Sequence, residues 1–526
     1  MTTPARDTLS PRGLLLLLAL TAALLLFRIG ALPLVGPDEP RYARVAVEMQ
    51  RAGEWVRPTL QGEPWLEKPP LYYWLAGAGY RLLGENETAA RLPSVLAALA
   101  LVGFTALLGA RLLGAAAGLQ AGFLLATAPL VFLYGRAASM DMLVAAGITG
   151  AVGLLALGLF GVAGRLAMPA AYLCAGLATL AKGPIGFLLP GLVIVGFAAA
   201  TRDAGIVRRA LSPLGLLLFL ATAGPWYLAV YAVEGAAFVD VFLLNHNLQR
   251  FSSTIHNHPG PVFYYVPVVV GLLFPWSGLV LPALASVAPR RSRVDLFLLL
   301  WFLLPFLFFS AAGSKLPGYI LPCLPPLALL AGRVLAQVAA GGSVTLPAAT
   351  GPRAIALVGL ALGALLAAAP VLARNREPLW MLLLPPALWA LVAAFMASRA
   401  WDRKPSTAPS VLRVGATGFL LLLAMTAPPV VARHESGREL FLPARGREVL
   451  VWGAWRTAWM AGYFYNDGRV REVSGLPGVL AALEAGPALV LCGPAERRLF
   501  ENAPGLAALV LAEGPRGNSL LRVGRR

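Results

Sequence analysis

Long apolar runs separated by short polar segments dominate this chain. A helix needs about 20 apolar residues to cross the hydrocarbon core of a bilayer. Thirteen stretches have this character: 13–32, 92–110, 114–133, 142–163, 167–181, 184–201, 210–231, 262–287, 294–312, 317–340, 354–373, 379–398 and 410–432. The pattern predicts an all-α polytopic membrane domain of about 13 transmembrane helices over residues 1–432. The first run is too long for a signal peptide and lacks a small-residue cleavage site, so we expect an uncleaved anchor.

Composition agrees with this pattern, because 58% of the residues are hydrophobic and 13% are charged. Alternate predicted loops carry basic residues that the positive-inside rule assigns to the cytoplasm, and the amino terminus joins them. These residues are Arg6, Arg12, Arg111, Arg165, Arg202, Arg208, Arg209, Arg290, Arg291, Arg293, Arg353, Arg399, Arg403 and Lys404. Much of the net charge of +18 therefore reflects topology. We expect no nucleic-acid partner, since the sequence shows no basic face with interleaved aromatic residues.

Residues 433–526 follow a different pattern. Strand-like stretches at 448–455, 469–473, 488–492 and 519–523 alternate with helical ones, which predicts a small α/β domain. Thirteen crossings from a cytoplasmic amino terminus place this domain on the outer face, together with the loops 33–91 and 232–261.

The first outer loop concentrates ionisable residues beside the bilayer. Its sequence predicts an interfacial helix from Pro37 to Gly53 and a second helix from Pro69 or Pro70 to Gly84. Lys68 then stands at a helix amino terminus, where amide groups and the dipole favour an anion such as a lipid phosphate. Glu67 is available as a metal ligand or as the counter-charge of Lys68.

Other features of this loop have two interpretations. Asp38 is either a helix cap or a catalytic acid, and the two roles are compatible. For Tyr72, Tyr73 and Trp74, an aromatic belt at the membrane surface is favoured over a sugar platform.

Two further predicted outer edges carry ionisable side chains. Arg136 and Asp141 flank one of them, so a second acid lies on the side of Asp38. Asp141 is suited to positioning, base or metal chemistry, or to capping the span that follows. Lys182 occupies a tight turn, where a snorkelling lysine is the competing interpretation.

The remaining outer edges add cations, a hydroxyl and an imidazole. Lys315 and Tyr319 lie in the segment Ser-Lys-Leu-Pro-Gly-Tyr at one edge. In the loop 232–261, His246 and Arg250 are four residues apart and face one way on a helix. A metal ligand and a phosphate clamp can come from such a turn.

Taken together, the motifs resemble those of the bacterial aminoarabinose transferases and related polyprenyl-phosphate-sugar glycosyltransferases of the GT-C fold. The resemblance runs essentially from end to end. It rests on six short motifs in order: Asp38-Glu39-Pro40-Arg41-Tyr42-Ala43, Glu67-Lys68-Pro69, Arg136 with Asp141, Lys182-Gly183-Pro184, Gln249-Arg250-Phe251, and Ser314-Lys315-Leu316-Pro317 with Tyr319. One departure is Pro40, which stands where the family usually has threonine or a similar residue.

The resemblance implies inverting transfer of a sugar from a polyprenyl-phosphate carrier to lipid A or another envelope acceptor. The site would face the periplasm from the bacterial inner membrane. Asp38 and Asp141 would be the catalytic acids, with Glu39, Arg136 and Lys182 as further site candidates. The carrier phosphate would be held by Lys68, Arg41, Arg250, Lys315 and Tyr319.

The resemblance also bears on cofactors and assembly. Glu67 and His246 would hold a divalent metal ion, whether zinc, magnesium or manganese, and no organic cofactor is implied. We expect membrane lipids around a monomer.

Three alternatives stay open at this stage. The nearest is a polyprenyl-phosphate hexose or mannose transferase that acts on protein or on another glycolipid, because the same outer loops would serve it. A lipid-linked sugar transporter or flippase predicts ionisable residues near the bilayer midplane, and almost none are present. An accessory protein without chemistry leaves the outer acids and cations unexplained.

Overall fold

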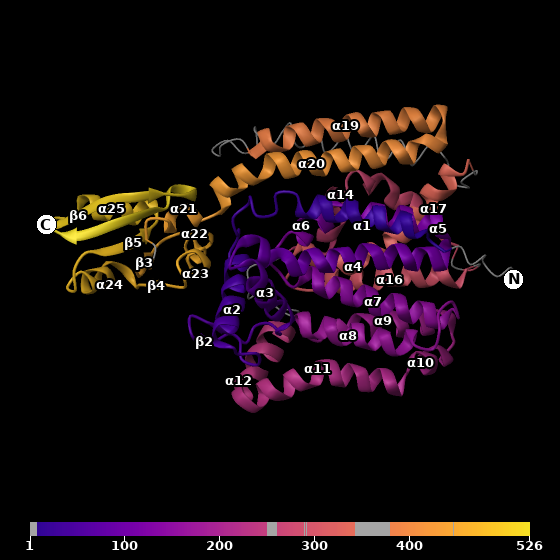
Figure 1. Ribbon diagram of the computed structural model, residues 1–526, viewed down its shortest axis with the longest axis horizontal. Helices are drawn as coiled ribbons and strands as arrows, with labels where there is room; N and C mark the ends of the chain where they lie inside the picture. Colours follow the sequence, from indigo (N-terminus) through magenta and orange to yellow (C-terminus); the bar gives the residue numbers. More distant parts are fainter. Residues whose placement is uncertain (1–7, 250–259, 289, 291, 342–378, 445) are drawn as a thin grey trace.

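The architecture comes from a computed structural model, which describes residues 8–249, 260–288, 290, 292–341, 379–444 and 446–526. A bundle of helices carries a sheet at one end, and α1 (Pro11–Leu26) begins at the other end of the bundle (Figure 1). The helices α2 and α3, from the segment 33–91 that was predicted to be the first outer loop, lie between the bundle and the sheet (Figure 1).

The bundle and its connections contain both regular helices and short irregular turns. In chain order they are α1 (Pro11–Leu26), α4 (Glu87–Leu113), α5 (Ala115–Ala126), α6 (Pro129–Gly135), α7 (Asp141–Leu159), α8 (Ala167–Lys182), α9 (Ile185–Thr201), α10 (Gly205–Ala210), α11 (Pro213–Glu234), α12 (Ala236–Phe238), the π-helix η1 (Val239–Gln249), η2 (Val262–Tyr264), α14 (Tyr265–Leu272), η3 (Trp276–Leu279), α15 (Val280–Ala285), α16 (Arg293–Ala311), η4 (Pro317–Cys323), α17 (Leu324–Ala339), α19 (Leu379–Arg403), η5 (Pro405–Thr407) and α20 (Ala408–Glu435).

Each predicted span overlaps a helix, except 354–373, which falls outside the described residues. Within the described residues, six helices are long and apolar enough to cross a membrane, or eight if each of two bent pairs is one span. The protein is therefore a multi-pass membrane protein, while its number of crossings stays a prediction.

The two bent pairs correspond to the predicted spans 114–133 and 262–287. α5 and α6 meet at 60°, and Val262–Leu272 meets Trp276–Ala285 at 115°. Pro129 starts α6 and Pro275 precedes η3. A proline has no amide hydrogen to donate and crowds the preceding turn, so a helix breaks there.

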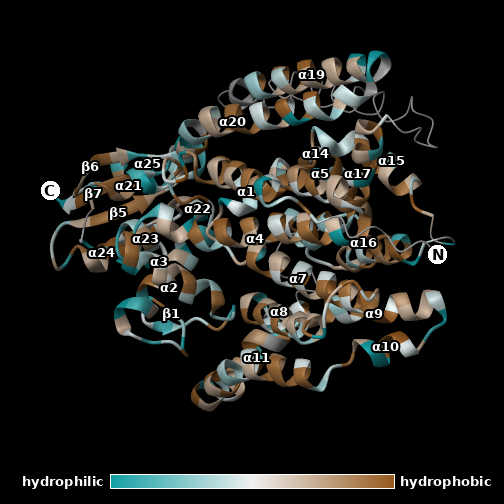
Figure 2. Ribbon diagram, turned by 45° about the vertical axis from the view of Figure 1, so that its right-hand side comes forward, coloured by the Kyte–Doolittle hydropathy of each residue, from teal (hydrophilic) through white to brown (hydrophobic). Residues whose placement is uncertain are grey.

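Small residues let the membrane helices pack closely. A Cβ added to Gly118 of α5 would lie 2.3 Å from the carbonyl oxygen of Ala106 and 2.4 Å from the amide nitrogen of Ala110, both in α4. Lipid tails are as apolar as side chains, so association within a bilayer depends on such contact rather than on a hydrophobic driving force. The bundle helices are largely brown in Figure 2, as this environment requires.

The first outer loop folds as two helices and a hairpin. α2 (Asp38–Ala52) and α3 (Leu71–Leu83) flank the antiparallel strands β1 (Thr59–Leu60) and β2 (Glu63–Pro64). Both helices end where the sequence predicted, at Gly53 and Gly84. Gly53 ends α2 in the left-handed conformation, with φ of 65°, which glycine adopts without a steric penalty.

A five-stranded sheet and short helices form the last part of the chain. The elements are α21 (Arg438–Phe441), β3 (Val449–Trp452), α22 (Arg456–Met460), α23 (Gly462–Tyr465), β4 (Val470–Glu472), α24 (Gly475–Ala482), β5 (Ala488–Cys492), α25 (Pro494–Asn502), β6 (Leu506–Glu513), η6 (Pro515–Gly517) and β7 (Ser519–Arg525). The strand order is β4-β3-β5-β7-β6. β3 pairs in parallel with β4 and β5, and β7 pairs antiparallel with β5 and β6.

Sequence analysis missed β6, the edge strand next to β7. Its sequence, Leu-Ala-Ala-Leu-Val-Leu-Ala-Glu, contains residues that favour helices and has no regular alternation of apolar and polar positions. The strand forms because β7 offers a free edge, which is a tertiary effect.

Candidate active site

Asp38 is the first residue of α2 and its side chain pairs with Arg41, one turn further on. Arg41 also donates from Nε to the carbonyl oxygen of Pro37, at 2.9 Å, and its guanidinium lies 5.2 Å from the ring centre of Trp65. The Asp38 side chain remains 52% exposed, whereas that of Arg41 is 11% exposed. The carboxylate is thus held by a cation and still open to a reactant.

Helix capping, the alternative interpretation of both acids, is not what the structure shows. The cap positions of α2 and α7 are Pro37 and Met140, and neither helix has a side-chain cap hydrogen bond. Asp38 and Asp141 instead occupy the first helical position, where a negative charge still interacts favourably with the helix dipole. Each acid pairs with a cation, which leaves both suited to positioning or acid-base chemistry.

Lys68 is buried just before α3, whose cap residue is Pro70. Its Nζ donates to the carbonyl oxygen of Glu67 at 3.2 Å. The neighbouring Glu67 carboxylate interacts electrostatically with Arg41. Two acids, Asp38 and Glu67, therefore share the electrostatic field of one arginine, next to a buried lysine.

Aromatic side chains pack beside these charged groups. Trp65 donates from Nε1 to the Tyr73 hydroxyl at 3.0 Å, and the Tyr42 and Tyr73 ring centres are 6.5 Å apart. Burial, followed by the charge of Asp38, raises the pKa of the Tyr42 phenol well above its usual value. Burial likewise raises the pKa of Tyr73. Both phenols therefore stay neutral over any ordinary pH range.

The membrane-belt interpretation is wrong for Tyr72 and Tyr73. Both side chains are fully buried, and Tyr72 donates to the carbonyl oxygen of Ala90 at 2.8 Å. α3 packs against α2 and α4 and encloses both rings, because burying their large apolar area stabilises the core. Trp74 is half-buried and donates to the carbonyl oxygen of Trp55 at 2.9 Å.

A second charged cluster joins three elements that are far apart in the sequence. Asp141 starts α7, Lys182 ends α8, and their side chains form an ion pair. The Lys182 Nζ also lies 4.7 Å from the ring centre of Tyr319 in η4. Lys182 is therefore not a lysine that merely snorkels into solvent, since it bridges an acid and an aromatic ring.

The segment before η4 places Lys315 in a buried position. Its ammonium donates to the carbonyl oxygen of Ala312, and a Cβ added to Gly260 would lie 3.0 Å from its Cδ atom. Tyr134 of α6 holds the next turn, because its hydroxyl accepts the amide hydrogen of Gly318 at 2.9 Å. Lys315 and Tyr319 thus project from one supported turn.

Glu39 and Arg136, two other predicted site residues, have structural partners. The Glu39 carboxylate accepts hydrogen bonds from Arg91 at 2.8 and 3.2 Å, from the amide of Ala138 at 2.6 Å and from that of Val35 at 2.8 Å. Arg136 donates to the last carbonyl groups of α1, at 2.8 to 3.0 Å. The hydrogen bond from Ala138 to Glu39 joins the first outer loop to the turn that carries Arg136 and Asp141.

The two charged clusters lie at the same end of the bundle. α3 follows directly from Lys68 and packs against α8, which ends at Lys182. Trp226 of α11 also donates from Nε1 to the carbonyl oxygen of Val56, at 2.9 Å, and so fixes the loop from a third side. This end also carries the sheet (Figure 1).

Other residues at this end were not singled out by sequence analysis. Arg91 is a cation at the edge of a predicted apolar span, and this was the available signal. Tyr463, from α23, lies near Arg41, whose charge affects its phenol. No local pattern marks Tyr463, because only the docking of the sheet brings it here.

Only part of the proposed metal site lies among the residues whose side chains are described. His246 lies in η1, whose backbone is described without that side chain, and Arg250 falls outside the described residues. No group of three histidine, cysteine, aspartate or glutamate side chains suited to a metal ion occurs among the residues whose side chains are described. Those residues do not by themselves fit a divalent ion.

Comparison with known proteins agrees with this arrangement. Over 77% of its length the chain is 34% identical to the undecaprenyl phosphate-α-4-amino-4-deoxy-L-arabinose arabinosyl transferase of Pseudomonas aeruginosa strain UCBPP-PA14, of which it covers 74%. With the transferase of strain PAO1 it shares 33% identity over 80% of this chain and 78% of the relative. The chain belongs to this family. It is a membrane glycosyltransferase, as its resemblance to aminoarabinose transferases predicted.

Solved structures extend the likeness to the fold of this family. The crystal structure of ArnT from Cupriavidus metallidurans bound to undecaprenyl phosphate is similar over 97% of both chains, with a TM-score of 0.79 and 26% identity. An Archaeoglobus fulgidus oligosaccharyltransferase has a TM-score of 0.51 and 12% identity over 92% of this chain and 68% of its own, which shows a shared fold alone. Residues 67–228 match the family of dolichyl-phosphate-mannose-protein mannosyltransferases. Together these matches place the bundle in the GT-C class.

Proposed function

We propose that this enzyme transfers 4-amino-4-deoxy-L-arabinose from an undecaprenyl-phosphate carrier to a phosphate of lipid A. The reaction would take place on the periplasmic face of the bacterial inner membrane. One observation carries the proposal: in a chain similar to ArnT over its whole length, acids and cations from four separate segments gather at one end of the bundle. Relatives named for this donor support the choice of sugar.

The leaving group is a lipid phosphate, so the site must stabilise negative charge. Lys68 is buried before the amino terminus of α3, where the helix dipole adds to its positive charge. Arg41 and Lys315 bring two more cations, and Tyr319 brings a hydroxyl donor. Fixed cations stabilise the phosphate more as the sugar bond breaks than before, which lowers the barrier. Arg250 belongs to this set by prediction.

The acceptor requires orientation more than deprotonation. A lipid A phosphate is already ionised, so Asp38 orients it through its ion pair with Arg41, whereas with a hydroxyl acceptor Asp38 would act as the base. Asp141, held by Lys182, shapes the field on the acceptor side. Attack opposite the bond to the carrier phosphate inverts the configuration of the sugar.

The remaining parts of the proposal concern assembly. Residues 1–432 form the transferase domain, with the loops 33–91 and 232–261 around the site, and residues 433–526 form a periplasmic domain. The enzyme works as a monomer without an organic cofactor. Glu67 and His246 stay as proposed ligands of a divalent ion, and no step above depends on that ion.

A second candidate is mannosyl transfer to protein, which the match of residues 67–228 favours. It would use the same cations on a polyprenyl phosphate. The two functions differ in acceptor and in sugar, so their products separate them.

The deciding experiment is mass spectrometry of lipid A and of envelope glycoproteins from cells with and without the protein. We expect lipid A to gain the mass of one aminopentose only when the protein is present. Lys68→Ala should abolish this gain, while Lys404→Ala, an exposed lysine far along the chain from the site, should not. Unchanged lipid A with altered glycoproteins would overturn the proposal in favour of the mannosyl transferase.

A further inference from the structure

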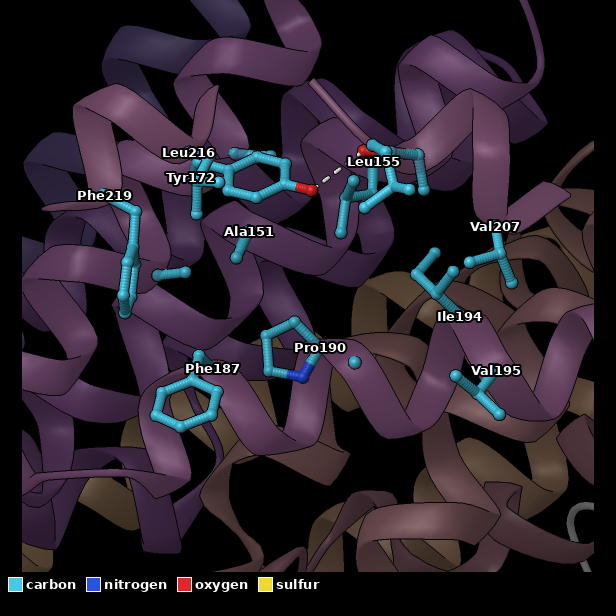
Figure 3. A pocket seen from close by; sticks show the side chains of 15 residues that line it. Ala151, Leu155, Tyr172, Phe187, Pro190, Ile194, Val195, Val207, Leu216 and Phe219 are labelled. Carbon is cyan, nitrogen blue, oxygen red and sulfur yellow. Dashed lines mark hydrogen bonds between the residues drawn. The ribbon is translucent and has the colours of Figure 1, made fainter. Parts of the chain in front are cut away.

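A cavity of about 300 Å³ lies among α7, α8, α9, α10 and α11 (Figure 3). Along α7, its lining residue Leu155 is about 21 Å from Asp141 at a rise of 1.5 Å per residue. Along α8, Tyr172 is about 15 Å from Lys182 by the same measure. At its other end the cavity reaches Phe187 in the first turn of α9, five residues after Lys182, so it extends along α9 from that end of the bundle towards α10.

The lining is apolar throughout its depth. Its one hydroxyl, on Tyr172, already donates to the carbonyl oxygen of Ala210 at 3.1 Å, which Figure 3 shows as a dashed line. A polar ligand would lose its hydrogen bonds to water here and gain none from these side chains. The apolar lining therefore favours a hydrocarbon chain as the ligand.

The cavity opens as a groove on the outside of the bundle. Among its lining residues, Phe187, Val195, Leu211 and Leu216 are 44%, 58%, 64% and 52% exposed. A Cβ added to Gly191 would meet no atom within 4 Å, so this glycine faces open space in the groove. In a multi-pass membrane protein the surface between such helices faces lipid, and a lipid chain can enter from the side.

Positive charge lies beside the lining at one end of the groove. Val207 and Ala210 of α10 line it, and Arg208 and Arg209 between them are exposed. Figure 2 shows α10 as a teal, hydrophilic segment among brown helices. Arg209 pairs with Asp203, at 2.8 Å, whereas no carboxylate among the described residues pairs with Arg202 or Arg208.

We propose that the groove binds an acyl chain of an anionic phospholipid whose phosphate pairs with Arg208 of α10 and with Arg202, the C-cap residue of α9 three positions before α10. A lipid tail gains little by leaving other tails for an equally apolar groove, so the head group must provide the selection. The two exposed arginines give an anionic head group that advantage. The head group would bind beside α10, about 24 Å along α9 from the helix end that follows Lys182, so the occupant is a structural lipid rather than a substrate.

The test uses the full-length protein in detergent, titrated with phosphatidylglycerol or phosphatidylcholine of the same acyl chains and observed by native mass spectrometry. We expect a bound lipid with preference for phosphatidylglycerol. Arg208→Gln should lower that preference about fivefold, the change expected for one basic side chain near a lipid surface. Lys404→Gln, which removes another exposed cation, should leave it unchanged.

A substitution that fills the groove provides a second, independent test of the proposal. Gly191→Leu should reduce the binding of both lipids, since its side chain would occupy the open space. Gly224→Leu is the matched control, because Gly224 is also a helical glycine with no neighbour within 4 Å and does not line the groove. Equal binding of the two lipids, or unchanged binding in Gly191→Leu, would overturn the proposal. Displacement of phosphatidylglycerol by undecaprenyl phosphate from the wild type would also overturn it, and would assign the groove to the carrier chain.

Discussion

At the scale of single residues, the acids of this enzyme are distinguished by their partners. Asp38 and Asp141 each begin a helix and each pair with a cation, while both retain some exposure. Glu39, next to Asp38, is buried and uses its two oxygens on Arg91 and two backbone amides. The two adjacent carboxylates thus have different roles: that of Asp38 is accessible to a reactant, and that of Glu39 stabilises the fold.

Replacing Asp38 with asparagine tests the reactive acid. The change keeps the shape of the side chain and removes its charge, so we expect the transfer rate to fall about 10²-fold, as for misplacement of a reacting group. The half-exposed position predicts normal folding. Transfer in proteoliposomes and the elution profile on size-exclusion chromatography measure the two effects. Glu63→Gln, on the exposed hairpin, is the control, and normal turnover of Asp38→Asn would refute the assignment.

Replacing Glu39 with glutamine tests the structural acid. Arg91 is 2% exposed on its side chain and would lose the one carboxylate with which it forms an ion pair among the described residues. Breaking a buried ion pair in this way destabilises a protein by about 3–5 kcal/mol. We expect a lower unfolding temperature in detergent by differential scanning fluorimetry. The exposed Glu439→Gln should leave that temperature unchanged, and equal stability of the two variants would contradict this role of Glu39.

At the scale of elements, the ends and contacts of helices position the site. α7 begins with Asp141 and α8 ends with Lys182, so the ion pair forms wherever these two helices pack antiparallel with their ends level. Lipid supplies no hydrophobic force to hold them, and small residues must therefore let them approach closely.

Substitution of Gly118, where α5 contacts α4, tests whether membrane helices of this bundle need small residues in order to pack closely. In Gly118→Ala the new methyl group would lie 2.3 and 2.4 Å from backbone atoms of α4, which cannot rotate away. We expect a loss of about 1–3 kcal/mol, typical of overpacking, seen as earlier thermal unfolding. Gly224→Ala, with open space around it, should unfold at the wild-type temperature. No difference between the two variants would show that α4 and α5 separate freely.

At the scale of the whole molecule, the sheet is attached to the first outer loop. Arg44 and Arg51 of α2 both donate to Asp467, and the Tyr465 hydroxyl accepts from the amide of Leu34 at 2.7 Å. Gln61 of the hairpin donates to the carbonyl groups of Gly468 and Val470, at 2.6 and 2.7 Å. The last part of the chain thus supports the loop that carries Asp38 and Lys68.

This attachment should weaken in acid. Burial opposes ionisation of Asp467, but hydrogen bonds from Arg44 and Arg51 outweigh it and lower the pKa of this carboxyl. A depressed pKa adds stability above the unfolded value of about 3.9, and that stability is lost as the pH falls through the folded value. Below about pH 4 we expect hydrogen exchange in α2 and α23 that is faster relative to the intrinsic rate of exposed amides at the same pH, because that intrinsic rate itself falls in acid.

Two controls accompany that prediction. Asp467→Asn should show the faster exchange already at neutral pH, with less further change in acid. High salt should mimic part of the effect, because the carboxylate is half-exposed and its pairs are screened. Exchange that does not depend on Asp467 would contradict the assignment of the attachment to these charges.

The sequence by itself determined the positions of the apolar helices that the structure describes, where α2 and α3 end and which scarce ionisable residues deserve attention. These features depend on local composition, on glycine and proline, and on the length of apolar runs. Only the tertiary structure decided which partner each residue meets: Asp141 with Lys182, Glu39 with Arg91, Tyr72 in the core and β6 beside β7. The two ion pairs join positions tens of residues apart, and β6 pairs with a strand whose place in the sheet is set by β5, so these contacts depend on how helices pack and strands align, which no local pattern along the chain encodes.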